Sequence, residues 1–96
     1  MIYHLVETSV WELGRDHPSI VTPGADGFLH CCDEHQLAGV QARYFAKDTT
    51  LVALEVDPTR LGFETRYELG SGGEPERFPH VYGPIDASAV SRVIEI

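Results

Sequence analysis

Three apolar runs of strand length, each with a histidine inside it, constrain the fold of this chain more than any other feature. The runs cover residues 2–6, 27–32 and 78–85, and their histidines are His4, His30 and His80. Residues two apart in a β-strand share a face, so each imidazole lies among apolar neighbours. Titratable rings in desolvated surroundings are typical of functional sites. The sequence therefore predicts that three strands converge on one partly dry pocket lined by these histidines.

Other interpretations of these residues stay open at this point. A histidine on an apolar strand face can be a core residue whose ring nitrogens bond backbone carbonyls. The three imidazoles could also bind a metal ion, with Glu55 or Glu68 adding a carboxylate, although no HxH or HxxxH spacing supports this. Cys31 could be a nucleophile, but strand alternation turns it away from the histidine before it and brings Cys32 to the pocket. Small apolar filler is the favoured role for both thiols.

The order of the remaining segments predicts an α+β fold of small mixed or antiparallel sheets with one main helix. Strand patterns occupy residues 2–6, 27–31, 50–56, 63–68, 78–85 and 90–96. One clear helix separates the second strand from the third, whereas the last three strands follow one another closely. A doubly wound parallel sheet would need more crossover helices. A chain of 96 residues has no room for two cores, so residues 1–96 are expected to form one domain.

The main helix is predicted to begin at Asp33, with Gln36 three residues on giving a start that resembles a capping box. Its apolar stripe should face the core and consists of Leu37, Val40, Tyr44 and Phe45. A shorter helix is expected to follow Thr8 or Ser9 and to end at Gly14, and a helical turn is expected at residues 86–89. The long connection over residues 15–26 is of a length that often carries function.

The charge balance excludes some partners and leaves others. Fifteen acidic residues against seven basic residues give a net charge of −8, and no cluster of Lys or Arg could hold a nucleic-acid duplex or an anionic membrane. A nest of backbone N–H groups could still bind a small anion. The chain begins in a strand, has no long apolar run and carries only two adjacent cysteines. These features predict a cytoplasmic protein without a signal peptide or a disulfide framework.

Several motifs together resemble one bacterial family along almost the whole chain. The resemblance is carried by residues 2–4 (IYH), Trp11, residues 27–31 (GFLHC), residues 54–58 (LEVDP), residues 66–68 (RYE) and residues 78–85 (FPHVYGPI). The chain is similar to DUF952, a family of proteins of about this length whose function is unknown. The run Phe-Pro-His, an aliphatic residue, then Tyr-Gly-Pro is the most specific of these motifs.

The resemblance implies a fold like that of ADP-ribosyltransferases, in which two small sheets form a split cleft that holds NAD. By that likeness, Tyr3 and His4 belong to the first motif strand, and His4 would bond a ribose hydroxyl. Phe28 to His30 would correspond to the second motif strand, which packs on the nicotinamide ring. NAD is accordingly the cofactor to expect, and a small molecule or nucleotide is the expected partner.

The third motif strand departs from that pattern. In many such enzymes it supplies a glutamate, whereas here His80 or Tyr82 occupies the comparable strand. Glu68 is the nearest carboxylate, and it comes from another strand. Members that transfer ADP-ribose to an RNA phosphate also lack the glutamate and use histidines and arginines, for which Arg66 and Arg92 would be the counterparts.

Three functions follow as hypotheses. The first is an enzyme that transfers or hydrolyses at the N-glycosidic bond, and its expected residues fall into two groups. The catalytic group is His4, His30, His80 and Glu68, and the cofactor-binding group is Tyr3, Phe28, Tyr82 and Arg66. The second hypothesis is a module that binds a nucleotide or small metabolite without chemistry. The third is a metal-dependent hydrolase with histidine ligands.

Overall fold

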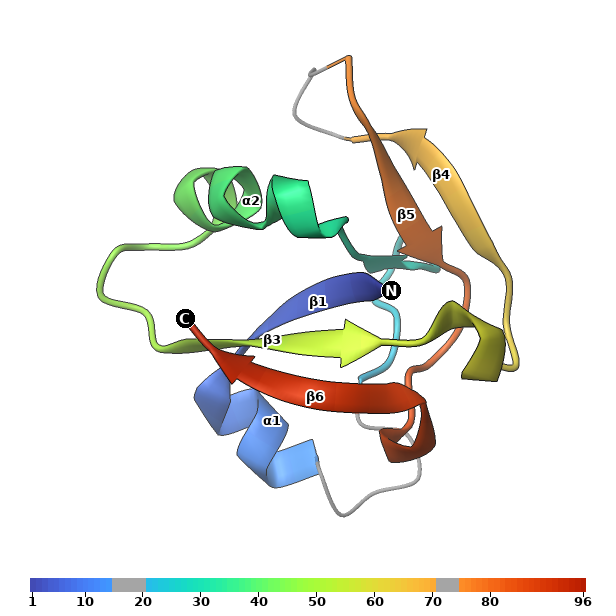
Figure 1. Cartoon of the computed structure of the whole chain (residues 1–96), viewed down its shortest axis with the longest axis horizontal. Coiled ribbons are helices and arrows are strands. Elements are labelled where there is room, and N and C mark those ends of the chain that lie inside the picture. The colour runs from blue at the N-terminus through green and yellow to red at the C-terminus, as the bar shows by residue number, and fades with distance from the viewer. Residues whose placement is uncertain (15–20, 71–74) are drawn as a thin grey trace.

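Two three-stranded antiparallel sheets form the body of the protein (Figure 1). The computed structural model describes residues 1–14, 21–70 and 75–96. The first sheet has the order β1-β3-β6 and the second the order β2-β5-β4. The strands are β1 (Ile2–Glu7), β2 (Leu29–His30), β3 (Leu51–Val56), β4 (Thr65–Leu69), β5 (Arg77–Val81) and β6 (Val90–Glu95). The α+β prediction is confirmed, and every pairing between these strands is antiparallel rather than mixed.

The described residues form two α-helices, the main helix and the shorter one that the sequence predicted to end at Gly14. Helix α1 (Thr8–Gly14) follows β1 directly, and α2 (Leu37–Tyr44) follows a 3₁₀ turn at Glu34–Gln36. Figure 1 shows the two helices on opposite sides of the first sheet. Further 3₁₀ turns occupy Pro58–Arg60 and Ala87–Ala89, the second of which was predicted. No helix in the described part of the chain has the length and apolarity needed to cross a membrane.

Strand β3 is the centre of the first sheet and is buried along its whole length. Its residues alternate between two apolar layers, as the sequence predicts for a strand with a neighbour on each side. Leu54 packs with residues of the second sheet and with Trp11 of α1, whereas Ala53 packs with Phe78 and with α2. Both side chains are fully buried. The two faces of one strand therefore link both sheets and both helices.

The start of α2 is fixed by hydrogen bonds that the sequence predicted. The backbone N–H of Asp33 donates to Oε1 of Gln36 at 2.8 Å, which is half of a capping box. The amide of Gln36 then donates to the carbonyl oxygen of Arg77 at 3.0 Å, so the helix start is tied to β5. Tyr44 corrects the predicted core stripe, because its side chain is 50% exposed while the other three members pack against the core.

Strand β2 is shorter than predicted, and this decides how the two sheets meet. Gly27 has a φ of +81°, a left-handed turn that suits glycine, so ladder pairing begins only at Leu29. After His30 the chain leaves the second sheet and Cys32 pairs with Tyr3 on β1. In the long predicted connections, residues 15–20 and 71–74 lie outside the described residues.

We expect Leu54→Ala to lower the free energy of unfolding by about 2–5 kcal/mol, because it removes apolar contacts on a fully buried site and leaves a cavity. Val93 lies opposite Leu54 in the register and is 41% exposed, so Val93→Ala is the matched control, with an expected cost of about 0.5 kcal/mol. Urea denaturation measures both values. Equal losses for the two variants would contradict the central role of β3.

Candidate functional site

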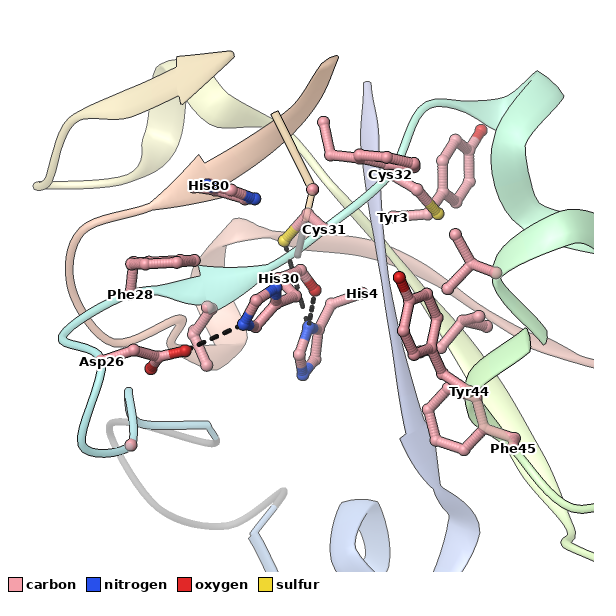
Figure 2. A pocket seen from close by; sticks show the side chains of 16 residues that line it. Tyr3, His4, Asp26, Phe28, His30, Cys31, Cys32, Tyr44, Phe45 and His80 are labelled. Atoms are coloured by element: carbon pink, nitrogen blue, oxygen red, sulfur yellow. Dashed lines mark hydrogen bonds and ion pairs between the residues drawn. The ribbon is translucent and has the colours of Figure 1, made fainter. Parts of the chain in front are cut away.

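A cavity of about 470 Å³ lies where the two sheets meet (Figure 2). The structure brings three strands to it, and His4 of β1, His30 of β2 and His80 of β5 all line it. The other walls come from the turn before β2 and from the end of α2. In Figure 2, Tyr44 and Phe45 lie on the other side of β1 from Phe28 and His80. The cavity therefore wraps around the edge of the first sheet.

His4 is held in one tautomer. Its Nδ1 lies 2.8 Å from the backbone carbonyl oxygen of His30, and a carbonyl only accepts, so Nδ1 carries the proton. Nε2 is then an unprotonated acceptor. Burial lowers the pKa of His4, so the ring is neutral at pH 7. A neutral imidazole with a fixed lone pair can accept a hydrogen bond from a ligand hydroxyl or amide.

His30 pairs with a carboxylate from the turn before its strand. Its Nε2 lies 2.9 Å from Oδ2 of Asp26, and each of these two side chains is about half exposed. The hydrogen bond from His30 lowers the pKa of Asp26, so this carboxyl group is ionised at neutral pH. The pair lies at the open side of the cavity and gives it one fixed negative charge.

His80 is the most deeply buried of the three imidazoles, with 3% of its surface exposed. Its Nδ1 lies 3.2 Å from Oε1 of Glu68, while its Nε2 is buried without a hydrogen-bond partner. The ring of Phe28 stacks on it with a centroid distance of 4.3 Å and an interplanar angle of 21°. An unpaired buried polar atom costs about 1–3 kcal/mol, which makes Nε2 the clearest acceptor for a ligand.

Tyr82 and Arg66 stand behind His80 rather than on the cavity wall. The Tyr82 hydroxyl donates to Oε1 of Glu68, and this hydrogen bond, followed by that of His80, lowers the pKa of Glu68. The guanidinium of Arg66 lies 4.8 Å above the Tyr82 ring and 2.9 Å from a carboxylate oxygen of Glu64. The predicted binding residues Tyr82 and Arg66 and the predicted catalytic residue Glu68 are thus placed to orient His80, and none of the three lines the cavity.

Tyr3 lines the cavity, but its hydroxyl is already engaged in a network inside the first sheet. It donates to Oε2 of Glu55 at 2.9 Å, and Arg92 donates to both oxygens of the same carboxylate at 3.2 and 2.8 Å. The hydrogen bonds from Arg92 and then Tyr3 lower the pKa of Glu55. Glu55 and Arg92 therefore link β1, β3 and β6, and neither is among the described residues that line the cavity.

Both cysteines line the cavity, Cys32 as expected and Cys31 in addition. Sγ of Cys31 lies 4.0 Å from Nδ1 of His4. The alternation holds, because Cys31 packs in the cluster with Leu54 and Cys32 in the cluster with Tyr3, but the cavity reaches both thiols. Burial raises the pKa of Cys31 strongly and that of Cys32 to about 12. Both thiols are protonated at neutral pH, which fits apolar filler rather than a nucleophile.

The imidazoles are oriented as metal ligands often are, but the described residues contain no metal site. Ligating histidines commonly donate their second ring N–H to a carboxylate or a backbone carbonyl, as His4, His30 and His80 do. However, no group of three or more His, Cys, Asp or Glu side chains within residues 1–14, 21–70 and 75–96 could hold a metal ion. The metal-dependent hydrolase therefore has no support from this geometry.

Sequence reasoning missed two residues of the site, Asp26 and Tyr44. Asp26 precedes Gly27, and an Asp-Gly pair signals a turn that folds the carboxylate back toward the strand after it. The Asp-Gly pair indicates the turn, but it does not indicate that the carboxylate binds His30. Tyr44 was assigned to the core because it fits the helix stripe, yet it is the last residue of α2 and faces the cavity rim. Periodicity alone does not separate a core from a cavity wall.

The family model of proteins of unknown function, DUF952, matches residues 6–93. The chain belongs to the DUF952 family. Two crystal structures resemble it: protein CC0527 from Caulobacter crescentus, with 30% identity and a TM-score of 0.81, and a double mutant of CC0527, with 28% and 0.80. Each match covers 98% of this chain and 83% of the other. The search of curated proteins found no match. Family membership is as predicted, whereas the likeness to ADP-ribosyltransferases stays a prediction.

His4 of this DUF952 chain gives a test of the site by NMR. At pH 6.5, the ordinary histidine value, we expect its ring to be mainly neutral, because burial disfavours the charged form and lowers the pKa. A long-range ¹H–¹⁵N spectrum should show the Nδ1–H tautomer, with the resonance assigned by its loss in His4→Gln. An imidazolium, or the Nε2–H tautomer, would contradict the proposed orientation of the lone pair.

Glu55 gives a test through acid stability. Its pKa is lower in the folded protein than in the unfolded chain, so its contribution is present above the ordinary value of about 4.3 and is lost as the pH falls through the folded value. We expect Glu55→Gln to lower the urea midpoint at pH 7 and to differ less from the parent protein at pH 3. The exposed Glu95→Gln on β6 is the control. A gap that stays constant with pH would refute this role.

Proposed function

We propose that the cavity binds a nucleotide, with NAD or a related compound as the first candidate, and acts at its N-glycosidic bond. The observation that carries this proposal is His4, whose neutral ring presents an unprotonated Nε2 to a cavity with aromatic walls. Such an acceptor suits a ribose hydroxyl. It fits the role that the resemblance to ADP-ribosyltransferases gives to this histidine.

The base of the nucleotide would pack against the aromatic group beside His4. Phe28 lies at the centre of this group, with ring centroids 4.8 Å from His30, 4.3 Å from His80 and 5.4 Å from Tyr82. Flat rings stack favourably at such separations. Phe28 and His30 are the residues that the resemblance assigns to the nicotinamide side, so geometry and likeness favour the same location for the base.

His80 with Glu68 is a suitable general base for the step in which water adds to the sugar carbon. The carboxylate accepts from Nδ1 and leaves Nε2 free to take a proton, as in other carboxylate–imidazole pairs. The bond from the sugar carbon to the ring nitrogen breaks with its electron pair going to that nitrogen, and nicotinamide leaves uncharged. Water then bonds to the sugar carbon and gives its proton to Nε2. Because Nε2 is buried, Phe28 must shift for water to reach it.

One observation favours a second candidate, a binding module without chemistry. Asp26 is hydrogen-bonded to His30, and Glu68 is hydrogen-bonded to His80 and does not line the cavity, so among the described lining residues no unpaired carboxylate is placed to contact the sugar directly. In that case the same cavity would hold the nucleotide, and His80 would only accept a hydrogen bond from it.

The proposal is tested by thermal shift and by nicotinamide release. At a concentration of 100 times Kd, NAD should stabilise the protein by about 2.7 kcal/mol. His4→Phe keeps a ring but removes the acceptor, and we expect it to weaken binding about tenfold. His80→Gln keeps a hydrogen-bond acceptor but cannot act as a base, so it should still bind NAD and lose nicotinamide release. The exposed His35→Gln is the control, with neither property changed.

The outcomes separate the two candidates. A shift with NAD and steady release of nicotinamide supports the enzyme, whereas a shift without release supports the binding module. No shift with NAD, ADP-ribose or nicotinamide would reject nucleotide binding altogether.

A further inference from the structure

The polar groups of the cavity are mainly hydrogen-bond acceptors. Each of the three histidines uses one ring N–H on a protein oxygen: His4 on a backbone carbonyl, His30 on Asp26 and His80 on Glu68. In the neutral form of each ring, the remaining nitrogen is therefore a lone pair. The ionised carboxylate of Asp26 adds further acceptors at the open side. A ligand that fits this polarity must bring its own N–H or O–H donors.

The charge of the site also favours a ligand without a phosphate. Carboxylates stand at both ends of the aromatic group, with Asp26 beside His30 and Glu68 beside His80. Among the described residues, none of the side chains that line the cavity is Lys or Arg. The nearest cation described on this side, Arg66, lies over Tyr82 and pairs with Glu64. A phosphate group inside the cavity would meet negative charge without a matching donor.

The aromatic surface completes the argument. The ring of Phe28 lies 4.3 to 5.4 Å from those of His30, His80 and Tyr82, and the rings of His30 and His80 lie 5.3 Å apart. Ring faces attract cations, and the attraction grows where water is excluded. His80 is 3% exposed, and its Nε2 has no hydrogen-bond partner among the described residues.

We propose, on the basis of the nucleotide function above, that the cavity takes the end of its ligand that is a flat heteroaromatic cation with hydrogen-bond donors, such as the N-riboside of a pyridinium ring. The positively charged ring lies against Phe28, on the side of the Asp26 carboxylate. Its carboxamide N–H₂ and its ribose hydroxyls donate to the lone pairs of His4 and His80. A 5′-phosphate weakens binding, so NAD binds less tightly than the nucleoside that forms this end of it.

Two matched ligand pairs test this selectivity by isothermal titration calorimetry. Nicotinamide riboside and nicotinamide mononucleotide differ only in the phosphate, and we expect the riboside to bind about tenfold more tightly. The 1-methylnicotinamide cation and neutral nicotinamide differ in charge, and the cation should bind more tightly. Equal or tighter binding of the mononucleotide would overturn the inference and leave the proposed nucleotide function standing. Failure of all four ligands and of NAD would remove both.

Substitutions in the protein test which carboxylate causes the preference for the riboside. Asp26→Asn should lower the affinity for the riboside about threefold to fivefold, since one carboxylate charge is lost. It should also reduce the ratio of the riboside affinity to the mononucleotide affinity. Glu12→Gln removes an exposed carboxylate on α1, away from the cavity, and should change neither affinity. If thermal denaturation shows that Asp26→Asn does not fold, Glu68→Gln provides the same comparison at the other end. An unchanged ratio in a folded variant of either kind would overturn the inference.

Discussion

The site depends on one short backbone bridge between the two sheets. The N–H of Tyr3 donates to the carbonyl oxygen of Cys32, and the N–H of Cys32 donates to that of Tyr3, each at 2.8 Å. This bridge fixes the edge of the first sheet against the chain that has just left the second. Because His4 follows Tyr3 and His30 lies two residues before Cys32, the same two hydrogen bonds set the distance between these imidazoles. Loss of the bridge would leave the two sheets joined by their shared apolar core, without the hydrogen bonds that align His4 with His30.

A second layer of oxygen atoms then gives each imidazole its chemistry. The carbonyl of His30, the carboxylate of Asp26 and the carboxylate of Glu68 each accept one ring N–H. Fixing the proton on one nitrogen fixes the lone pair on the other, so three rings that could each donate become three acceptors. Tyr82 holds Glu68 in turn, and Arg66 lies over Tyr82. Glu68, Tyr82 and Arg66, which the sequence analysis assigned to the site, therefore act through His80 and do not line the cavity.

Strand periodicity predicts a large part of this arrangement and fails where a strand ends early. The alternation around β3, the capping at Asp33 and the antiparallel pairing of β4 all follow from local patterns. The presence of Cys31 at the cavity does not, because it depends on how the short β2 meets the edge of the first sheet. The orientation of the histidine rings also lies beyond periodicity. It requires partners such as Asp26 and Glu68, whose positions are set by tertiary packing.

The burial of His80 shows how stability and binding are coupled in this fold. Its Nδ1 is satisfied by Glu68 and its face is covered by Phe28, yet Nε2 has no partner in the described structure. A purely structural core would favour an apolar side chain at this position, since an unpaired buried acceptor costs about 1–3 kcal/mol. A ligand that donates to Nε2 recovers that cost on binding. The same atom that destabilises the empty cavity thus contributes directly to the affinity for a donor.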